Sequence, residues 1–333
     1  MSSPGRSAPP GFLFLDPPDH TRLRKLVSKA FSPRVVKALE PDITTMVDDL
    51  LDKAAQTSEF DAIEQLAHPL PVAVICRLLG VPIEDEAQFS SASTVFLAQG
   101  LDPFATFTGE PPQGLEERLK AGMWLRGYLR DLLERRRAAP RDDLMSGLIA
   151  VEESGDQLTE EEIVATCNLL LIAGHETTVN LIANAILAML RHREHWTALS
   201  ADRDLAPPNI IEETLRYDPP VQLVSRVAGA DMQIGETRIP PKGDIMMLLL
   251  AAAHRDPELT ERPNDFDPTR NPIRHLAFGH GPHFCLGAPL ARMEAAVALT
   301  AVTRRFPHAR LAAEPIYKPH VTLRGMARLD VAV

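Results

Sequence analysis

The chain has 333 residues, of which 45% are hydrophobic, and this is enough to form a globular core. The length lies slightly above the range of about 250–300 residues in which single cores tend to divide, so one large domain and two smaller ones are both allowed. Lys and Arg number 35 and Asp and Glu number 45, so the formal net charge is −10. A chain this acidic lacks the basic field that phosphate contacts need, which argues against a nucleic-acid partner.

The beginning of the chain is polar and leads into Pro9-Pro10-Gly11 without an apolar stretch of signal-peptide length, so we expect a cytoplasmic protein. The most apolar stretch, Leu169 to Leu190, contains polar side chains that would be costly in lipid. It is therefore predicted to be a buried helix and not a membrane span. The spacing of the three cysteines indicates neither a disulfide framework nor paired zinc ligands: Cys76, Cys167 and Cys285.

Helical periodicity dominates up to about Tyr217, and it predicts helices over Asp19–Phe31, Pro41–Ala55 and Leu115–Arg137. The longest helix is predicted to begin near Thr159, where Thr159 and Glu162 have the form of a capping box. Its apolar pattern continues to about Leu190. About 30 residues extend about 45 Å, so this helix must cross the domain and lie buried in it.

After Pro219-Pro220 the pattern changes to short apolar runs between Gly and Pro residues, which is typical of strands. A final helix is predicted from about Pro289, because proline suits a first helical position. Two runs in the tail are interpreted as a hairpin. The fold class is mainly α with a small β-sheet, and the predicted strands are Val221–Val227, Met232–Ile234, Arg238–Ile239 and Ile245–Leu250, with Val321–Leu323 and Leu329–Val333 as the hairpin.

The segment Phe278 to Gly287 contains three glycines, which indicates a tight loop that approaches another group closely. Cys285 ends this loop just before the final helix, where the helix dipole and free N–H groups stabilise a thiolate. Three interpretations compete for it: a buried structural cysteine, a zinc site with His280 and His283, or a haem ligand. The zinc interpretation lacks a fourth ligand at the usual spacing.

The string F-G-x-G-x-H-x-C-x-G in this loop resembles the haem-binding signature of the cytochrome P450 family at every fixed position. The resemblance implies haem b as cofactor, Cys285 as the axial ligand of its iron, and Phe278 and Gly279 as parts of the haem-binding loop. In such a family the thiolate favours cleavage of the O–O bond.

Ala173-Gly174-His175-Glu176-Thr177-Thr178 lies near the middle of the long predicted helix. Small Ala173 and Gly174 would let a flat ligand pack against the backbone, and Thr177 could bond back to a carbonyl group. A kinked core helix with satisfied polar groups explains the same residues. The segment also resembles the oxygen-activating motif A-G-x-E-T-T of the family. That resemblance implies that Thr177 holds dioxygen and water by hydrogen bonds and that Glu176 helps to relay protons.

Further residues match the family in order along the chain. Glu213 and Arg216 lie three apart on one helix face, and the resemblance adds Arg270 as the third member of a group that supports the cysteine loop. Haem carries two propionates and therefore needs cations. The resemblance assigns this role to His20, Arg24, Arg226 and His283, although each alone could be an ordinary surface residue.

The resemblance covers about Phe12 to Val333, which we interpret as one domain over residues 1–333 with residues 1–11 flexible. Bacterial members of the family usually have several tens of residues before the segment that begins here at Asp16. We therefore expect an N-terminally truncated chain, with an unpaired edge at Ile245–Leu250, lower stability and a more open pocket.

The resemblance implies a monooxygenase that inserts one oxygen atom from dioxygen into a hydrophobic small molecule, in secondary metabolism. Ferredoxin and ferredoxin reductase are the expected electron donors, with Arg274 and Arg292 contributing to the docking face. Apolar residues between Phe89 and Phe107 favour a hydrophobic substrate, although core packing explains them equally well. Two alternatives are a haem-binding but inactive relic or sensor, and a zinc-binding helical protein.

Overall fold

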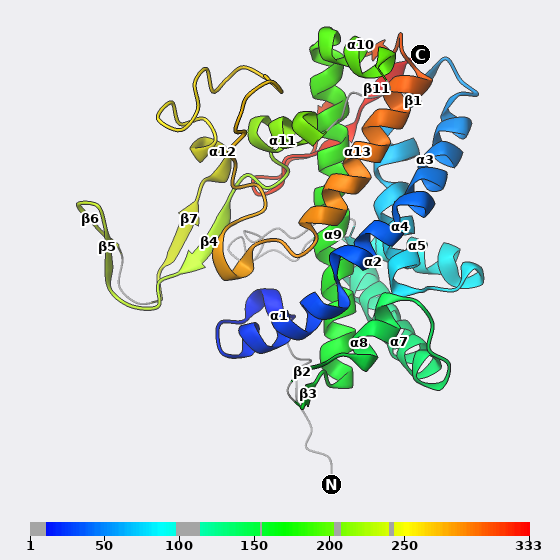
Figure 1. Ribbon diagram of the computed structural model, residues 1–333, viewed down its shortest axis with the longest axis vertical. Helices are drawn as coiled ribbons and strands as arrows, with labels where there is room; N and C mark the ends of the chain where they lie inside the picture. Colours follow the sequence, from blue (N-terminus) through cyan, green and yellow to red (C-terminus); the bar gives the residue numbers. More distant parts are fainter. Residues whose placement is uncertain (1–10, 98–113, 154, 203–207, 240–242) are drawn as a thin grey trace.

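The computed structural model describes residues 11–97, 114–153, 155–202, 208–239 and 243–333. Helices dominate, and the longest, α9 (Glu160–Arg191), runs through the middle of the molecule (Figure 1). The other helices, with 3-10 and π turns marked η, are η1 (Phe12–Phe14), α1 (Asp19–Ala30), α2 (Pro33–Ala38), α3 (Glu40–Ala54), η2 (Ile63–Ala67), α4 (Pro69–Leu79), α5 (Ile83–Leu97), α7 (Leu115–Ala138), α8 (Leu144–Ala150), α10 (Arg193–Ala201), α11 (Pro208–Tyr217), α12 (Leu250–Ala253), η3 (Gly281–His283) and α13 (Ala288–Arg305). The prediction of a mainly helical fold is confirmed.

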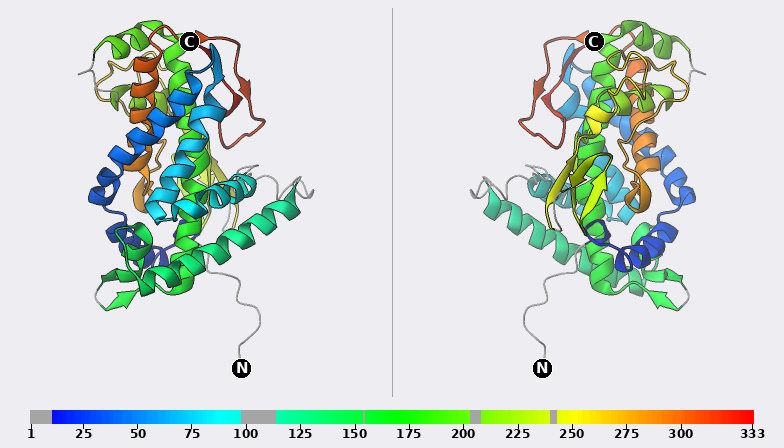
Figure 2. Two further views of the ribbon diagram at one scale, coloured as in Figure 1. Left: turned by 90° about the vertical axis from the view of Figure 1, so that its right-hand side faces the viewer. Right: turned by 90° about the vertical axis from the view of Figure 1, so that its left-hand side faces the viewer.

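The central helix α9 begins and packs as its sequence predicts. The Thr159 N–H donates to Glu162 Oε2 at 2.8 Å and the Glu162 N–H donates to Thr159 Oγ1 at 3.3 Å, which completes the capping box. α9 contacts α4, α7, α11 and α13, so it lies at the centre of the helices that pack around it (Figure 2). It is long and apolar enough to cross a membrane, but 72% of its most apolar window is buried inside the structure, as in a core helix.

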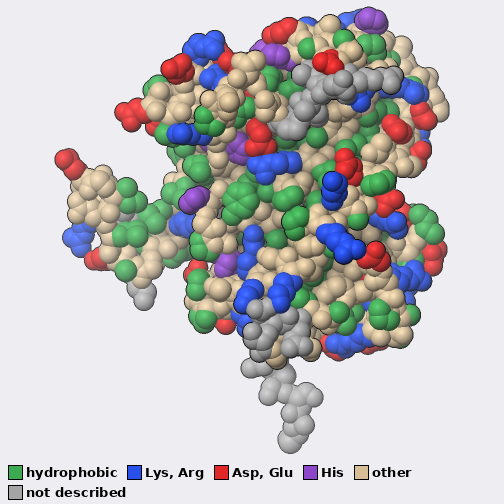
Figure 3. All heavy atoms as spheres, viewed as in Figure 1, with side chains coloured by type: hydrophobic (Ala, Val, Ile, Leu, Met, Phe, Trp, Pro, Cys, Tyr) green, Lys and Arg blue, Asp and Glu red, His purple; other side chains and the backbone are tan. Residues whose placement is uncertain are grey.

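The strands form small antiparallel sheets beside the helices. β4 (Val224–Val227) pairs with β7 (Ile245–Leu248), and β5 (Met232–Ile234) pairs with β6 (Thr237–Ile239) in a hairpin that projects from the body (Figures 1 and 3). The remaining strands are β1 (Glu59–Asp61), β2 (Glu152–Glu153), β3 (Asp156–Gln157), β8 (Arg310–Leu311), β9 (Ile316–Tyr317), β10 (Met326–Arg328) and β11 (Asp330–Ala332). Among the described strands β7 pairs with β4 alone, as expected for an edge, and Ile245 and Met247 are exposed there.

The predicted hairpin at the end of the chain is wrong. β11 lies between β1 and β8, and β10 pairs with β9, while Leu323 forms an isolated bridge with Val221. Alternating apolar residues indicate a strand and its buried face, but they do not identify its neighbour. Two predicted strands are also too long: the first begins at Val224, and the other ends at Leu248 before α12.

Some predictions fall on parts of the chain that the structure does not describe. These are residues 1–10 of the segment that was expected to be flexible, and part of the apolar stretch from Phe89 to Phe107 that favoured a hydrophobic substrate, including Leu101, Phe104 and Phe107.

Candidate active site

The cysteine loop folds tightly between α12 and α13, as its glycines predict. Gly279 and Gly281 adopt φ of 73° and 75°, a left-handed conformation that glycine allows at little cost. The Cys285 N–H donates to the Phe278 carbonyl oxygen at 2.9 Å, so the loop returns on itself. Cys285 is half-buried three residues before α13, which starts at Ala288. The loop thus presents the thiol from a fixed backbone.

The surroundings of Cys285 act on its thiol in opposite directions. Burial raises the pKa of Cys285, whereas the N–H groups of Gly287 and Ala288 and the charges of Arg24 and Arg292 lower it. The expected stabilisation by the helix start is therefore present, but burial outweighs it in the polypeptide alone. A cation placed at the sulfur atom would favour the thiolate further.

The middle of α9 contains an opening in an otherwise buried surface. Ala173 and Gly174 are exposed, while His175 and Glu176 directly after them are buried. A Cβ atom at Gly174 would meet no other atom within 4 Å. The Thr177 hydroxyl donates to the Ala173 carbonyl oxygen at 2.9 Å, which confirms the expected back-bond. The structure therefore leaves room for a flat group against this turn of the helix.

The predicted cations around the loop come from α1, β4 and the loop itself. His20 is buried, and its ring lies 4.1 Å, centroid to centroid, from that of His283. Arg24 donates to the Phe284 carbonyl oxygen at 2.6 Å. Arg226 is exposed on β4 and donates to the Ser225 carbonyl oxygen. His20, Arg24 and His283 are thus brought together beside Cys285, and Arg226 stands on a separate element.

The environment of His20 indicates a binding site for an anionic group. Both of its ring nitrogens are buried and have no hydrogen-bond partner among the described residues. Burial lowers the pKa of His20, and the neighbouring charges of His283 and Arg24 lower it further. Buried nitrogens without hydrogen-bond partners destabilise the folded state, and so does a cluster of like charges. An anion bound in the cluster would accept the hydrogen bonds and offset the charges.

The predicted support group is assembled in full. Arg216 donates from Nε to Glu213 Oε2 at 2.8 Å and from Nη2 to Glu213 Oε1 at 2.7 Å, and both side chains are completely buried. Arg270 Nε donates to Glu213 Oε1 at 3.2 Å. The remaining guanidinium N–H groups bond to main-chain oxygens of His254, Pro263 and Asp265. The charges are therefore paired and hydrogen-bonded, as burial requires.

His254 connects this group to the cysteine loop, which the sequence did not reveal. Its Nδ1 donates to the Arg216 carbonyl oxygen at 3.1 Å, and its Nε2 accepts from the Leu276 N–H at 2.7 Å. The Leu276 carbonyl oxygen in turn accepts from the Gly279 N–H. Both ring nitrogens can be satisfied in this way only when the imidazole is neutral.

We expect His254 to make the protein less stable in acid. Burial, followed by the charge of His275, lowers the pKa of His254 from 6.5 to about 4. The unfolded chain therefore takes up a proton first, so stability is full above about pH 6.5 and falls by at most about 3 kcal/mol as the pH drops to about 4. Urea unfolding of His254→Gln, which can make both bonds without titrating, should show a weaker fall over this range. An unchanged pH dependence would remove His254 as its source.

A second ionic group beside the loop also escaped prediction. Arg292 donates to Glu212 through Nε at 2.6 Å and Nη2 at 2.9 Å, and His275 Nε2 lies 2.9 Å from Glu212 Oε2. Burial raises the pKa of Glu212, but hydrogen bonds from Arg292 and His275 prevail and lower it to about 2. The Arg292 guanidinium also lies 4.4 Å from the centroid of the Phe278 ring. Arg292 is therefore paired within the protein, and its expected contribution to the docking face stays a prediction.

Glu176 has an unexpected partner as well. Lys318, directly after β9, donates from Nζ to Glu176 Oε1 at 3.1 Å. These residues are 142 positions apart, so no sequence spacing indicated the pair. The expected proton-relay carboxylate is thus held by a cation from the end of the chain.

The chain matches the family described as Cytochrome P450 over residues 2–206 and 208–323. It belongs to the cytochrome P450 family. The structure of Mycobacterium smegmatis CYP164A2 in its ligand-free state is similar, with a TM-score of 0.88 and 67% identity over 98% of this chain and 82% of that one. Cytochrome P450 107B1 of Saccharopolyspora erythraea is 43% identical over 97% of this chain and 77% of its own length. Vitamin D(3) 25-hydroxylase of Pseudonocardia autotrophica is also 43% identical, over 97% of this chain and 78% of its own.

As a member of the cytochrome P450 family the protein is a haem-thiolate monooxygenase with haem b as cofactor, and it inserts one oxygen atom from dioxygen into a hydrophobic small molecule. The residues present fit haem. The open turn at Gly174 suits a flat ring, the orphaned nitrogens of His20 suit a propionate, and Cys285 offers a sulfur ligand. Membership decides against the zinc-binding alternative, and the described residues contain no group of three or more His, Cys, Asp or Glu that could hold a metal ion.

Proposed function

We propose that the site between α9 and the cysteine loop is the monooxygenase centre of this chain. Cys285 would bind the haem iron, Phe278 and Gly279 would shape the loop on the cysteine side, and Ala173 and Gly174 would lie against the opposite face. His20, Arg24, His283 and Arg226 would bind the propionates. The observation that carries this proposal is the exposed turn at Ala173 and Gly174 in a helix that is otherwise buried on both sides of it.

Bound haem supplies the activation of dioxygen, with one oxygen atom entering the substrate and the other leaving as water. The protein must supply protons and exclude bulk water. The Thr177 hydroxyl donates its hydrogen to the Ala173 carbonyl oxygen. The hydroxyl oxygen can therefore still accept a hydrogen bond from a water molecule at the opening. Glu176 is the neighbouring carboxylate that can take up and release a proton there.

Thr177→Ala tests this arrangement. We expect it to bind haem as the parent does but to release a larger share of the consumed dioxygen as hydrogen peroxide, up to the limit of one peroxide per dioxygen, because a positioned proton donor favours full reduction to water. The assay measures the hydrogen peroxide formed and the dioxygen consumed. NADH supplies the electrons through a surrogate ferredoxin and ferredoxin reductase. Thr178→Ala, a buried neighbour outside the proposed site, is the control. Equal peroxide release from the parent and Thr177→Ala would contradict the role of Thr177. A parent that consumes no dioxygen would instead favour the inactive relic or sensor.

The relatives in this family act on hydrophobic substrates and receive electrons from partner proteins. For this chain the donor would be a ferredoxin with its reductase, in the cytoplasm, and the chain would work as one domain. Lys and Arg side chains gather around α1 on the face shown in Figure 3, where Arg24 also meets the cysteine loop. That face would receive an acidic donor.

A further inference from the structure

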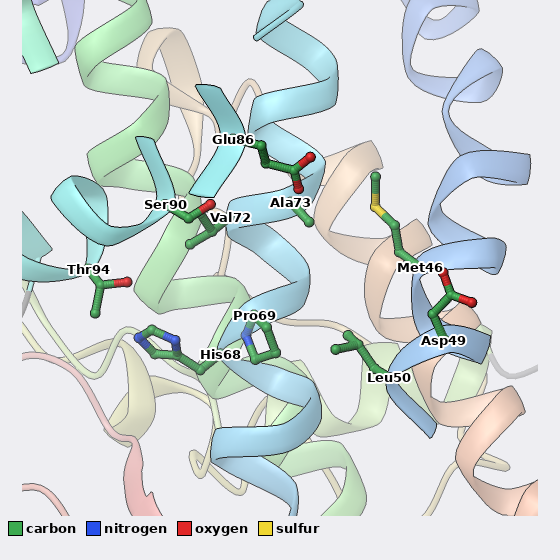
Figure 4. A pocket seen from close by; sticks show the side chains of 10 residues that line it. All are labelled: Met46, Asp49, Leu50, His68, Pro69, Val72, Ala73, Glu86, Ser90 and Thr94. Atoms are coloured by element: carbon green, nitrogen blue, oxygen red, sulfur yellow. The ribbon is translucent and has the colours of Figure 1, made fainter. Parts of the chain in front are cut away.

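A cleft of about 350 Å³ lies between α3, α4 and α5, away from the cysteine loop. Met46 and Asp49 of α3 line it together with Glu86, Ser90 and Thr94 of α5, and Figure 4 shows the two groups with α4 between them. Its walls carry two carboxylates and two hydroxyl groups, so the cleft is suited to hold water.

His68 is the residue that joins this cleft to α9. It lines the cleft at the start of α4, directly after the π turn η2, where its N–H donates to the Ile63 carbonyl oxygen at 2.8 Å. On its other side its ring meets the ring of His175 edge-on, with 4.8 Å between the centroids. Burial lowers the pKa of His68, the charge of Lys318 lowers it further, and Glu176 raises it. His68 is therefore close enough to both members of the pair to feel their charges.

The far side of this cluster is fixed by the segment that joins β9 to its partner strand β10. The Lys318 N–H donates to the Gly325 carbonyl oxygen at 3.0 Å. Gly325 packs so closely on Asn180, one turn of α9 after Glu176, that a Cβ atom there would collide with the Asn180 amide. The backbone of Lys318 is thus held over the Glu176 face of α9, and its ammonium reaches Glu176.

We propose that the protons used at this site enter through the α3–α4–α5 cleft, that His68 passes them to Glu176, and that Lys318 is the positioning residue that holds the Glu176 carboxylate where it can receive them. The inference rests on the proposed role of Glu176. One proton passes from water in the cleft to the imidazole of His68 and then to the Glu176 carboxylate. Lys318 keeps its charge throughout. Once neutral, Glu176 is attracted less strongly to Lys318 and is free to turn toward Thr177.

His175 has a different part in this route. Burial lowers its pKa to about 3, with a further contribution from the charge of His68. It therefore stays neutral and supports the ring of His68 by packing. The other charged groups that line the cleft beside His68 are Asp49 and Glu86.

The test compares His68→Phe, which keeps the ring contact without the nitrogens, with Lys318→Met in the haem-loaded protein. Peroxide release driven by NADH and a surrogate ferredoxin and reductase needs no identified substrate, and each peroxide molecule takes up two protons. We expect each variant to slow this release by at least about fivefold and to enlarge the ratio of rates in H₂O and D₂O. Arg328→Met, an exposed cation on the neighbouring strand β10, is the matched control and should leave both values unchanged.

A second readout is independent of turnover. Proton NMR titration of the His68 ring should show its pKa rising toward the ordinary histidine value in Lys318→Met and staying constant in Arg328→Met. Rates and isotope ratios equal to the parent in His68→Phe would overturn the route, as would an unchanged His68 pKa in Lys318→Met. If either variant fails to fold, His68→Gln and Lys318→Arg replace it, with slow release expected for the first and near-parental release for the second. Loss of haem binding or dioxygen consumption in the parent would instead reject the proposed function itself.

Discussion

Replacing Cys285 with serine is expected to remove monooxygenase activity while leaving the fold in place. A serine hydroxyl stays protonated where the thiolate would bind, so the iron loses its sulfur ligand. Loss of a residue that only supports a metal ligand typically costs about 10- to 100-fold, so loss of the ligand itself should cost more than about 100-fold. The measurement is NADH-driven dioxygen consumption with a surrogate ferredoxin and reductase, beside the haem content of each preparation.

Cys76→Ser is the matched control. Burial raises the pKa of Cys76 to about 12, and its sulfur atom lies 3.9 Å from Ser90 Oγ, so this cysteine stays protonated and has a polar neighbour that tolerates a hydroxyl group. It should keep parental activity. Activity retained in Cys285→Ser would show that the thiol is not the ligand.

Glu213→Ala is expected to have the largest effect on stability. It leaves the fully buried guanidinium of Arg216 without its carboxylate and also removes a partner of Arg270. Breaking a buried ion pair on one side typically costs about 3–5 kcal/mol. Urea unfolding monitored by circular dichroism measures this loss. Because the group reaches the cysteine loop through His254 and Leu276, haem content should fall as well.

Asp265→Ala supplies the comparison, since its carboxylate pairs with Arg262 at the surface and such pairs contribute about 0–1 kcal/mol. Equal losses in the two variants would mean that the buried group is no more important than an exposed pair.

Local signals predicted much of this structure. The capping box at Thr159 located the start of α9, and the glycines of the cysteine loop indicated its tight turn. The spacing of Glu213 and Arg216 predicted a pair on one helix face, and the structure adds that it is buried. These features depend on residues that are close in the chain, where periodicity and capping chemistry operate.

Contacts between distant segments were not predictable in the same way. Glu212 and Arg292 form an ion pair although they are 80 positions apart in the sequence, and Glu176 and Lys318 form one although they are 142 positions apart. No local pattern around any of these residues indicates its partner, and only the packing of helices and strands brings the partners together. The prediction of a hairpin in the tail failed for the same reason, because β11 pairs with the distant strand β1 and with β8.

The most direct test of the account is the absorbance spectrum of the purified chain, reduced and then exposed to carbon monoxide. A Soret band at the long wavelength typical of haem-thiolate proteins is the predicted result, because it requires haem in the site and a thiolate on its iron. Folded protein that shows no haem band, when produced with ample haem, would contradict the central claim that Cys285 and α9 form a haem-thiolate site.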